Sequence, residues 1–297
     1  MSERRRDVLT GPYDLGRSLF VADHGSRNPT IRQIGAGELH RATHTPEGPA
    51  ALRVLVDPSA GTVDSETWGP GASWLLARVP SLLGLDDRPP RLEGLPGRLQ
   101  RRCPGVRMVR APSVFELLVA YVLRQRVAWR DAVATQYEIQ AKLGVPAPGP
   151  LALQLPPSAA QWRTLGATDL AAMGIERKRA RTILGLAARA DRVSEWAALA
   201  PEAFAAKIEL LPGIGPWTSG MVRGWGLGDP DVVPLGDYEL PSMVAWGLTR
   251  EARADDARMV ELLAPWAGQR FRVIRQLWAA GIRAPRFGPR IRGQRPR

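Results

Sequence analysis

The residues best suited to chemistry lie in residues 210–240, which read LLPGIGPWTSGMVRGWGLGDPDVVPLGDYEL. Residues 211–215 join two stretches of helical periodicity and place a glycine on each side of the apolar residue Ile214. Glycines permit a tight turn and let the backbone approach another molecule closely. Pro216 stands at the expected first position of the next helix, where its missing N–H costs little. The segment therefore predicts two helices joined by a glycine-rich hairpin.

Such a hairpin presents backbone N–H groups that have no partner inside the helix, and these groups attract anions. Thr218 lies in the first turn of the second helix and adds one more such group. A GxG pattern alone also occurs in plain αα-hairpins. Here no strand precedes the turn and the net charge of the chain is +12. Both observations favour a clamp on a DNA phosphate over a plain hairpin.

Asp237 follows Trp217 by 20 residues and could bring a carboxylate to this hairpin. Apolar Val232 and Val233 precede it, and a helical pattern over residues 238–248 follows it. An aspartate at such a place commonly caps the helix by accepting its first N–H groups. Held beside a phosphate clamp, the same carboxylate could also stabilise positive charge that develops on a sugar. The two roles are compatible.

The charge of the chain points to a polyanionic partner. Arginine supplies almost all of the positive charge, because the only lysines are Lys142, Lys178 and Lys207. Residues 266–297 hold nine arginines and no acid, and residues 98–110 form a second basic stretch without acids. Such patches attract DNA through the release of counterions. Arginine-rich composition that serves solubility is the alternative reading.

Several classes of chemistry are excluded by residue counts. A single cysteine, Cys103, rules out an internal disulfide, a cysteine zinc site and an iron–sulfur cluster, and fits a reducing cytoplasm. The histidines are His24, His40 and His44, so a site built from later residues must rely on carboxylates. No apolar run is long enough to span a membrane, and the N-terminus MSERRRDVLT lacks the apolar core of a signal peptide.

The elements that must position these residues fall into two parts. Residues 1–108 are expected to form a small α+β domain, with short β-prone runs and a helix over residues 72–85 that Pro80 kinks. The expected strands cover residues 30–34, 39–44, 52–56 and 62–68.

From about residue 112 onward the pattern is helical. Residues 113–127 begin with Ser113 as N-cap and Glu116 completing a capping box, and their centre LLVAYVL is apolar all round, which predicts a buried helix. Residues 145–158 form a proline-rich connection. Residues 109–285 are expected to form one helical domain, with the hairpin motif at about 201–226, and residues 286–297 a basic flexible tail. Further helices are expected at residues 131–143, 159–165, 167–173, 177–190, 194–199 and 201–210.

LPGIGPWTSG followed by GDYEL resembles the helix–hairpin–helix DNA glycosylase superfamily, and within it the 3-methyladenine DNA glycosylase II family. The resemblance runs over residues 10–281, and the hairpin with its aspartate is its most specific part. It implies a mainly α fold with an N-terminal α+β layer, in which two helical lobes surround a DNA-binding cleft. Weaker matches are PYDL at residues 12–15, residues 113–129 with Gln125, LAAMG at residues 170–174, and Arg179-Ala180.

The resemblance also implies roles for individual residues. Asp237 takes the catalytic role. The main chain of Gly213, Gly215 and Thr218 contacts a DNA phosphate, while Gln125 and Arg126 fill the space that a flipped base leaves. Main-chain carbonyls of the hairpin would hold a structural monovalent cation, and these belong to Glu209, Leu211 and Ile214. No other cofactor is implied.

Trp217 decides the expected reaction subtype. Bifunctional relatives carry a lysine here, which forms a Schiff base with the sugar and cleaves the strand, so tryptophan implies hydrolysis alone. Aromatic faces attract a cationic alkylated purine by about 0.5–2 kcal/mol each. The implied base pocket holds Trp217, Met221, Tyr238 and Trp278, of which Met221 departs from the aromatic residue of the family. Arg126 likewise departs from the usual apolar wedge, although arginine can also stack.

The sequence thus predicts a monofunctional glycosylase that flips an alkylated purine out of double-stranded DNA and hydrolyses its glycosidic bond. The expected state is a monomer without membrane contact, in the bacterial cytoplasm with the nucleoid. Two alternatives stay open: a glycosylase for another lesion, such as uracil or an oxidised base, and a non-catalytic module that uses the hairpin to bind DNA. A neutral base would need an acid to help it leave, and a pure clamp would need no aspartate at residue 237.

Overall fold

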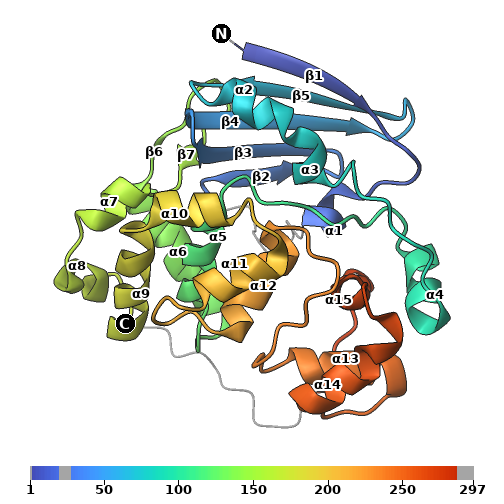
Figure 1. The fold of residues 1–297 in the computed structure, drawn as a ribbon. Coiled ribbons are helices and arrows are strands. Elements are labelled where there is room, and N and C mark those ends of the chain that lie inside the picture. The colour runs from blue at the N-terminus through green and yellow to red at the C-terminus, as the bar shows by residue number, and fades with distance from the viewer. Residues whose placement is uncertain (1, 20–27, 286–297) are drawn as a thin grey trace.

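The computed structural model describes residues 2–19 and 28–285, and an antiparallel sheet lies at one end of a mainly helical body (Figure 1). The strand order is β1-β5-β4-β3-β2. Four of the strands match those expected from sequence within a few residues. The strands are β1 (Ser2–Val8), β2 (Ile31–Ile34), β3 (Glu38–Thr45), β4 (Gly48–Asp57) and β5 (Thr62–Trp68).

Strand β1 was not expected, because its sequence SERRRDV carries no β-prone apolar residue before Val8. It pairs with β5 in full register, from Ser2 opposite Trp68 to Val8 opposite Thr62. Cross-strand charge pairs replace apolar contacts: Arg4 lies 3.0 Å from Glu66, and Arg6 lies 2.6 Å from Asp64. Pairing with a partner strand therefore compensates for weak local propensity.

Three short helices cover the sheet. Pro80 does more than kink the expected helix, because the chain forms two helices, α2 (Ala72–Ala77) and α3 (Val79–Leu83), with Arg78 between them. With α1 (Leu15–Leu19) they bury an apolar core against β4 and β5. This core includes Leu52, Val54, Val63, Leu75 and Leu82, each at most 1% exposed.

The remaining chain forms the helical body beneath the sheet (Figure 1). Most helices start within a few residues of the expected positions and are shorter than expected. Within residues 2–19 and 28–285, no helix is both long and apolar enough to cross a membrane. The helices are α4 (Gly94–Arg102), α5 (Val114–Leu123), α6 (Trp129–Leu143), α7 (Ala159–Arg163), α8 (Ala167–Ala172), α9 (Arg177–Ala187), α10 (Ala190–Trp196), α11 (Pro201–Ile208), α12 (Pro216–Gly226), α13 (Leu240–Thr249), α14 (Asp256–Leu263) and α15 (Arg270–Ala279).

Helix α5 is the centre of this body and is apolar on almost every side, as expected from sequence. Its N-cap is Ser113, whose Oγ accepts the Glu116 N–H at 3.3 Å. The expected capping box is wrong, because the Glu116 carboxylate accepts the Thr43 hydroxyl at 2.9 Å and the His44 N–H at 2.9 Å. Glu116 thus joins the helical body to β3.

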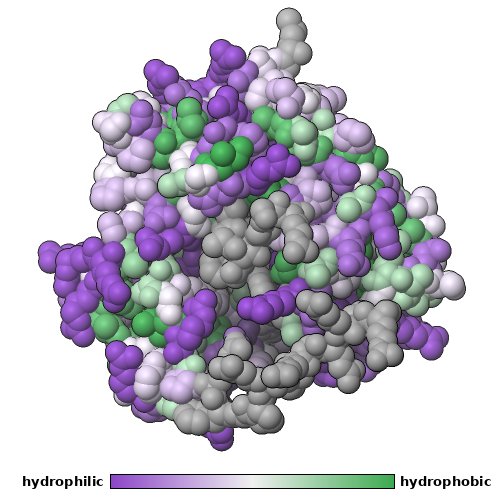
Figure 2. Space-filling model, turned by 180° about the vertical axis from the view of Figure 1, so that it is seen from behind, coloured by the Kyte–Doolittle hydropathy of each residue, from purple (hydrophilic) through white to green (hydrophobic). Residues whose placement is uncertain are grey.

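The proline-rich connection contains a small hairpin that the sequence did not predict, formed by β6 (Val145–Pro146) and β7 (Gln154–Leu155). Strand β7 packs beside β3 and α6. The basic tail that we expected at residues 286–297 lies outside the described residues, and so does His24. Seen from behind, the described surface is mainly hydrophilic, and its apolar residues form small separate groups (Figure 2).

Candidate functional site

The glycine-rich hairpin lies between α11 and α12, as predicted. The turn is tight, since the Ile214 N–H donates to the Leu211 carbonyl at 3.0 Å. Ile214 is 5% exposed and anchors the turn in the core. Pro216 is the first residue of α12, and its N-cap Gly215 offers no capping side chain. The N–H groups of the first turn are therefore left for another acceptor.

The two glycines of the hairpin differ in their backbone conformation and in the space around them. Gly213 has φ +89°, and a Cβ atom built on it would lie 1.9 Å from the Thr182 hydroxyl of α9. Gly215 has an ordinary φ of −117°, and a Cβ atom there would meet nothing within 4 Å. The fold itself therefore requires glycine at 213, whereas at 215 only an approaching molecule would.

Asp237 lies directly beside the first turn of α12. The Trp217 indole N–H donates to its Oδ2 at 2.7 Å, and its Oδ1 accepts the N–H groups of Glu239 and Leu240 at 2.9 and 2.8 Å. The carboxylate thus caps α13 and contacts Trp217, the two features that the sequence placed 20 residues apart. Three N–H donors hold its orientation, and a carboxylate retains further lone pairs for a ligand.

Close packing of the loop before Asp237 fixes this geometry. Pro234 lies against Gly220 of α12, where a Cβ atom would stand 2.9 Å from the Pro234 Cα. On the other side, the Gly236 N–H donates to the Asp256 carboxylate at the start of α14, at 2.7 Å. Gly236 has φ +85°, which an L-amino acid rarely adopts. The loop is therefore held at both ends of its last turn.

Helix α12 presents a row of large side chains that begins at Trp217. Met221 and Trp225 follow at successive turns and are buried, at 6% and 9% exposure. Trp225 stacks on Trp278 of α15, with ring centroids 5.9 Å apart and planes inclined by 27°. Of the four residues expected to form a base pocket, three thus lie on or against one face of α12.

Tyr121 of α5 also belongs to this region, and sequence reasoning missed it. Its ring meets that of Trp217 edge to face, with centroids 5.8 Å apart. In the sequence it stands within the apolar run LLVAYVL, where a tyrosine is most simply read as core. No local signal pairs it with a residue almost a hundred positions later.

The loop after α5 reaches the hairpin. Gln125 Nε2 lies 2.9 Å from both the Gly213 carbonyl and the Thr218 hydroxyl, so Gln125 ties the loop to the hairpin. Arg126 stands exposed at its tip with φ +56°, a conformation that costs a non-glycine residue about 1–2 kcal/mol. The tip thus holds a strained arginine toward solvent beside the candidate phosphate site.

Helix α9 supports both the loop and the hairpin. Arg179 donates to the Leu123 carbonyl at the end of α5, at 2.9 Å. Thr182, one turn later, lies 3.1 Å from the Pro212 carbonyl of the hairpin. The sequence pointed to Arg179 only through a family resemblance, and the structure gives this residue a physical role.

Comparison with solved structures identifies this arrangement of elements. A 3-methyladenine DNA glycosylase from Archaeoglobus fulgidus superposes with a TM-score of 0.77 at 19% identity, over 93% of this chain and 96% of that one. An 8-oxoguanine glycosylase/lyase from Clostridium acetobutylicum superposes with a TM-score of 0.68 at 11% identity, over 94% and 98%. The chain has the helix–hairpin–helix DNA glycosylase fold.

Sequence relatives match part of the chain. No family model matches. A probable bifunctional transcriptional activator/DNA repair enzyme AlkA of Mycobacterium tuberculosis is 29% identical over 55% of this chain and 34% of its own length. The chain therefore spans about a third of the length of the curated relatives it matches. The Schizosaccharomyces pombe 3-methyladenine DNA glycosylase Mag1, solved with abasic DNA, has a TM-score of 0.52 at 17% identity, over 63% of this chain and 91% of that one.

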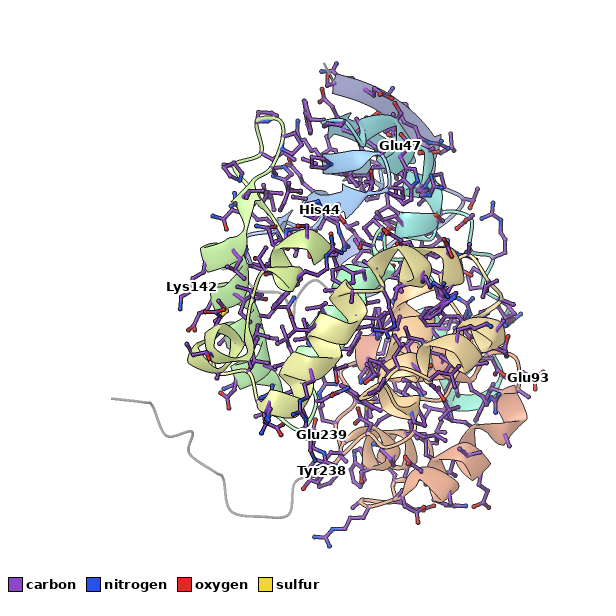
Figure 3. The ribbon with its side chains drawn as sticks, turned by 60° about the vertical axis from the view of Figure 1, so that its left-hand side comes forward. His44, Glu47, Glu93, Lys142, Tyr238 and Glu239 are labelled. Atoms are coloured by element: carbon purple, nitrogen blue, oxygen red, sulfur yellow. The ribbon has the colours of Figure 1, made fainter. Side chains whose placement is uncertain are left out.

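The remaining site residues expected from sequence are Tyr238 and the hairpin residues Glu209, Leu211 and Ile214. Tyr238 is 97% exposed and points away from the body at the lower edge in Figure 3, so it does not join the aromatic row on α12. The three carbonyls expected to hold a monovalent cation belong to the hairpin turn, where that of Leu211 already accepts the Ile214 N–H. No cluster of three or more His, Cys, Asp or Glu side chains that could hold a metal ion occurs within residues 2–19 and 28–285.

Proposed function

We propose that the protein is a monofunctional DNA glycosylase that hydrolyses the N-glycosidic bond of alkylated purines of the 3-methyladenine type. The observation that carries this proposal is the contact between Asp237 and Trp217 at the first turn of α12. It brings a carboxylate and an aromatic ring to the turn whose N–H groups have no capping side chain. The carboxylate suits the sugar, the aromatic ring suits the base, and the N–H groups suit the phosphate of one nucleotide.

Binding begins with the backbone of DNA. A phosphate accepts the free N–H groups of Gly215 and Thr218 at the start of α12 and gains from the helix dipole. Gly213 shapes the turn that presents them. The damaged base then leaves the duplex, at a cost of a few kcal/mol, and the exposed Arg126, with Gln125 beside it, would fill the gap. Double-stranded DNA with a damaged base is thus the proposed partner.

The chemical step breaks the bond between C1′ of the sugar and the base nitrogen. The bonding electrons leave with the base, so a cationic alkylated purine departs as a neutral molecule and needs no general acid. The sugar acquires oxocarbenium character, which the Asp237 carboxylate stabilises. Water then attacks C1′ and gives up a proton, for which Asp237 is the nearest acceptor we assign.

Strand cleavage is not part of the proposal, because it requires an amine beside C1′. Trp217 stands where a lyase would carry lysine, and Lys142, Lys178 and Lys207 lie on α6, α9 and α11. The likeness to an 8-oxoguanine glycosylase/lyase raises an oxidised purine as a second substrate class. That lesion is neutral, and its departure would need a proton donor that none of our assignments supplies.

A single-turnover assay on duplex DNA tests the proposal. Duplexes with 3-methyladenine, 7-methylguanine or 8-oxoguanine would be incubated with wild type and Asp237→Asn, and abasic sites read with and without alkali. We expect release of methylated bases by the wild type, at least a hundredfold slower release by the variant, and strand breaks only after alkali. Breaks without alkali would overturn the monofunctional assignment. DNA binding without release of any base would leave the non-catalytic module.

A further inference from the structure

Residues 235–239, which we call the Asp237 loop, have little burial to hold them in place. Asp237 itself is half-buried, and the other four residues are exposed. Figure 3 shows Tyr238 and Glu239 at the lower edge of the body. The position of the Asp237 carboxylate therefore depends on hydrogen bonds more than on packing.

The hydrogen bonds of Asp237 itself leave the backbone before it free. Its Oδ1 accepts the N–H groups of Glu239 and Leu240, two and three residues later, so these contacts move together with the loop. The Trp217 indole N–H ties the carboxylate to α12, but it contacts only the end of the side chain. A further contact is needed to fix the chain that leads into Asp237.

Asp256, the first residue of α14, supplies this contact. Its Oδ2 accepts the N–H of Gly236 at 2.7 Å. Gly236 has φ +85°, and glycine has more backbone freedom than any other residue. Because the hydrogen bond fixes the peptide group of Gly236, it removes much of this freedom directly before Asp237.

Helix α14 is a firm support for the contact. It packs against α13, and Figure 1 shows the two helices side by side. Its Met259 and Leu263 are fully buried. The Ser242 hydroxyl of α13 also accepts the Ala254 N–H at 3.3 Å, just before α14 begins. The start of α14 is thus fixed to the helix that follows the Asp237 loop.

Two successive aspartates at the start of α14 have different partners. Asp255 is the N-cap, and its Oδ1 accepts the Arg258 N–H of the same helix at 2.9 Å. Asp256 instead contacts the Asp237 loop, and its Oδ1 is buried without a hydrogen-bond partner among the described residues. A buried acceptor that lacks a donor costs stability. Stability alone therefore does not account for a carboxylate at residue 256.

We propose that Asp256 is a positioning residue, which holds the Asp237 carboxylate in place through the Gly236 N–H. This inference rests on the proposed function, in which Asp237 stabilises positive charge on the sugar. Such a carboxylate must keep a set distance from C1′, and a displacement of about 1 Å can slow a reaction by about a hundredfold. Asp256 lies on α14 and not on the hairpin that binds phosphate, so its loss should slow the chemical step and leave DNA affinity unchanged.

Asp256→Ala and Asp256→Asn test this inference, with Asp255→Ala as the matched control. Single-turnover release of 7-methylguanine from a duplex is measured with saturating protein, beside DNA affinity by fluorescence anisotropy and stability by thermal unfolding. We expect Asp256→Ala to release the base about tenfold to a hundredfold more slowly at unchanged affinity. Asp256→Asn keeps a side-chain oxygen for the Gly236 N–H and should retain most of the wild-type rate. Asp255→Ala loses its cap and should unfold at a lower temperature, yet release the base at the wild-type rate.

Hydrogen exchange of the backbone amides, measured without DNA, follows the Asp237 loop independently of activity. The N–H groups of Glu239 and Leu240 should exchange faster in Asp256→Ala than in the wild type, and at the wild-type rate in Asp255→Ala. Asp256→Ser, whose hydroxyl ends one atom short of the carboxylate oxygens, replaces Asp256→Ala if that variant does not fold.

Three outcomes would overturn the proposal. Release by Asp256→Ala at the wild-type rate would show that the contact does not position Asp237. Equal losses of rate in Asp256→Ala and Asp255→Ala would indicate a general effect of α14 stability, and equal losses in Asp256→Ala and Asp256→Asn would assign the effect to charge instead of the hydrogen bond. No release by the wild type would refute the glycosylase alone, because faster exchange confined to Asp256→Ala would still retain Asp256 as the residue that holds the loop.

Discussion

Alanine at Gly213 and alanine at Gly215 should have opposite consequences, although the same short turn contains both glycines. At Gly213 the new Cβ would stand 1.9 Å from the Thr182 hydroxyl on a backbone with φ +89°. Forcing an L-residue into this conformation and moving the turn away from α9 costs about 1–3 kcal/mol. We expect Gly213→Ala to unfold at a clearly lower temperature, by several degrees, in a thermal melt.

At Gly215 the protein itself offers no obstacle. Its φ of −117° suits alanine, and a Cβ atom there meets nothing within 4 Å. Alanine is a poorer N-cap than glycine but restricts the unfolded chain, and these effects of about 0.5–1 kcal/mol oppose each other. Stability should therefore stay close to that of the wild type. The methyl group would instead occupy the space in which a phosphate approaches the N–H groups of α12.

Fluorescence anisotropy with a labelled duplex, read beside the thermal melts, separates the two effects. Gly215→Ala should weaken DNA binding at least tenfold, which corresponds to about 1.4 kcal/mol, at unchanged melting temperature. Tight binding by Gly215→Ala would refute the phosphate contact at this turn. A Gly213→Ala protein as stable as the wild type would refute the contact with Thr182.

Three further predictions concern other parts of the molecule. Lys178 is exposed on α9, one turn before Thr182. Lys178→Ala should weaken duplex binding and lower, by about 1, the slope of the logarithm of the binding constant against the logarithm of the salt concentration. The matched control Lys142→Ala, at an exposed position on α6, should change neither the affinity nor this slope. Arg126→Gly should change stability by less than about 1 kcal/mol, because glycine accepts φ +56° but gains freedom in the unfolded chain. The same variant should slow base excision, and equal excision rates would exclude Arg126 from filling the gap. Burial raises the pKa of Glu116 above its usual 4.5, although Arg41 and His44 oppose this shift. Ionised Glu116 therefore costs stability at neutral pH, and the wild type should gain stability relative to Glu116→Gln as the pH falls from neutral toward 4.5; parallel melting curves for the two proteins would contradict this.

Features encoded over a few neighbouring residues could be predicted from the sequence. The hairpin, Pro216 at the first position of α12 and the cap formed by Asp237 all have local signatures, and the structure places them together. The N-cap role of Ser113 is local as well. Roles that depend on partners distant in the chain could not be read in this way.

Glu116 illustrates the limit. Glu116 stands three residues after Ser113, which is the spacing of a capping box. In the structure its carboxylate instead accepts hydrogen bonds from the Thr43 hydroxyl and the His44 N–H of β3. Tyr121 and Thr182 likewise acquire their roles from contacts with α12 and the hairpin. Strand β1 forms because it pairs with β5 along its whole length. Its own residues have too little β-propensity to predict a strand.

The double support by α9 has a consequence for how the protein would examine a duplex. Because one helix holds the Leu123 carbonyl through Arg179 and the Pro212 carbonyl through Thr182, the spacing between the tip loop and the hairpin is set before any DNA arrives. A bound duplex would then have to place one phosphate at the hairpin and its base stack at the tip loop, at a separation that the protein fixes. A duplex that is intact and stiff must bend to match that separation, whereas one weakened at a lesion yields at little cost. Discrimination would thus begin with the mechanical compliance of the DNA, before any base reaches the pocket.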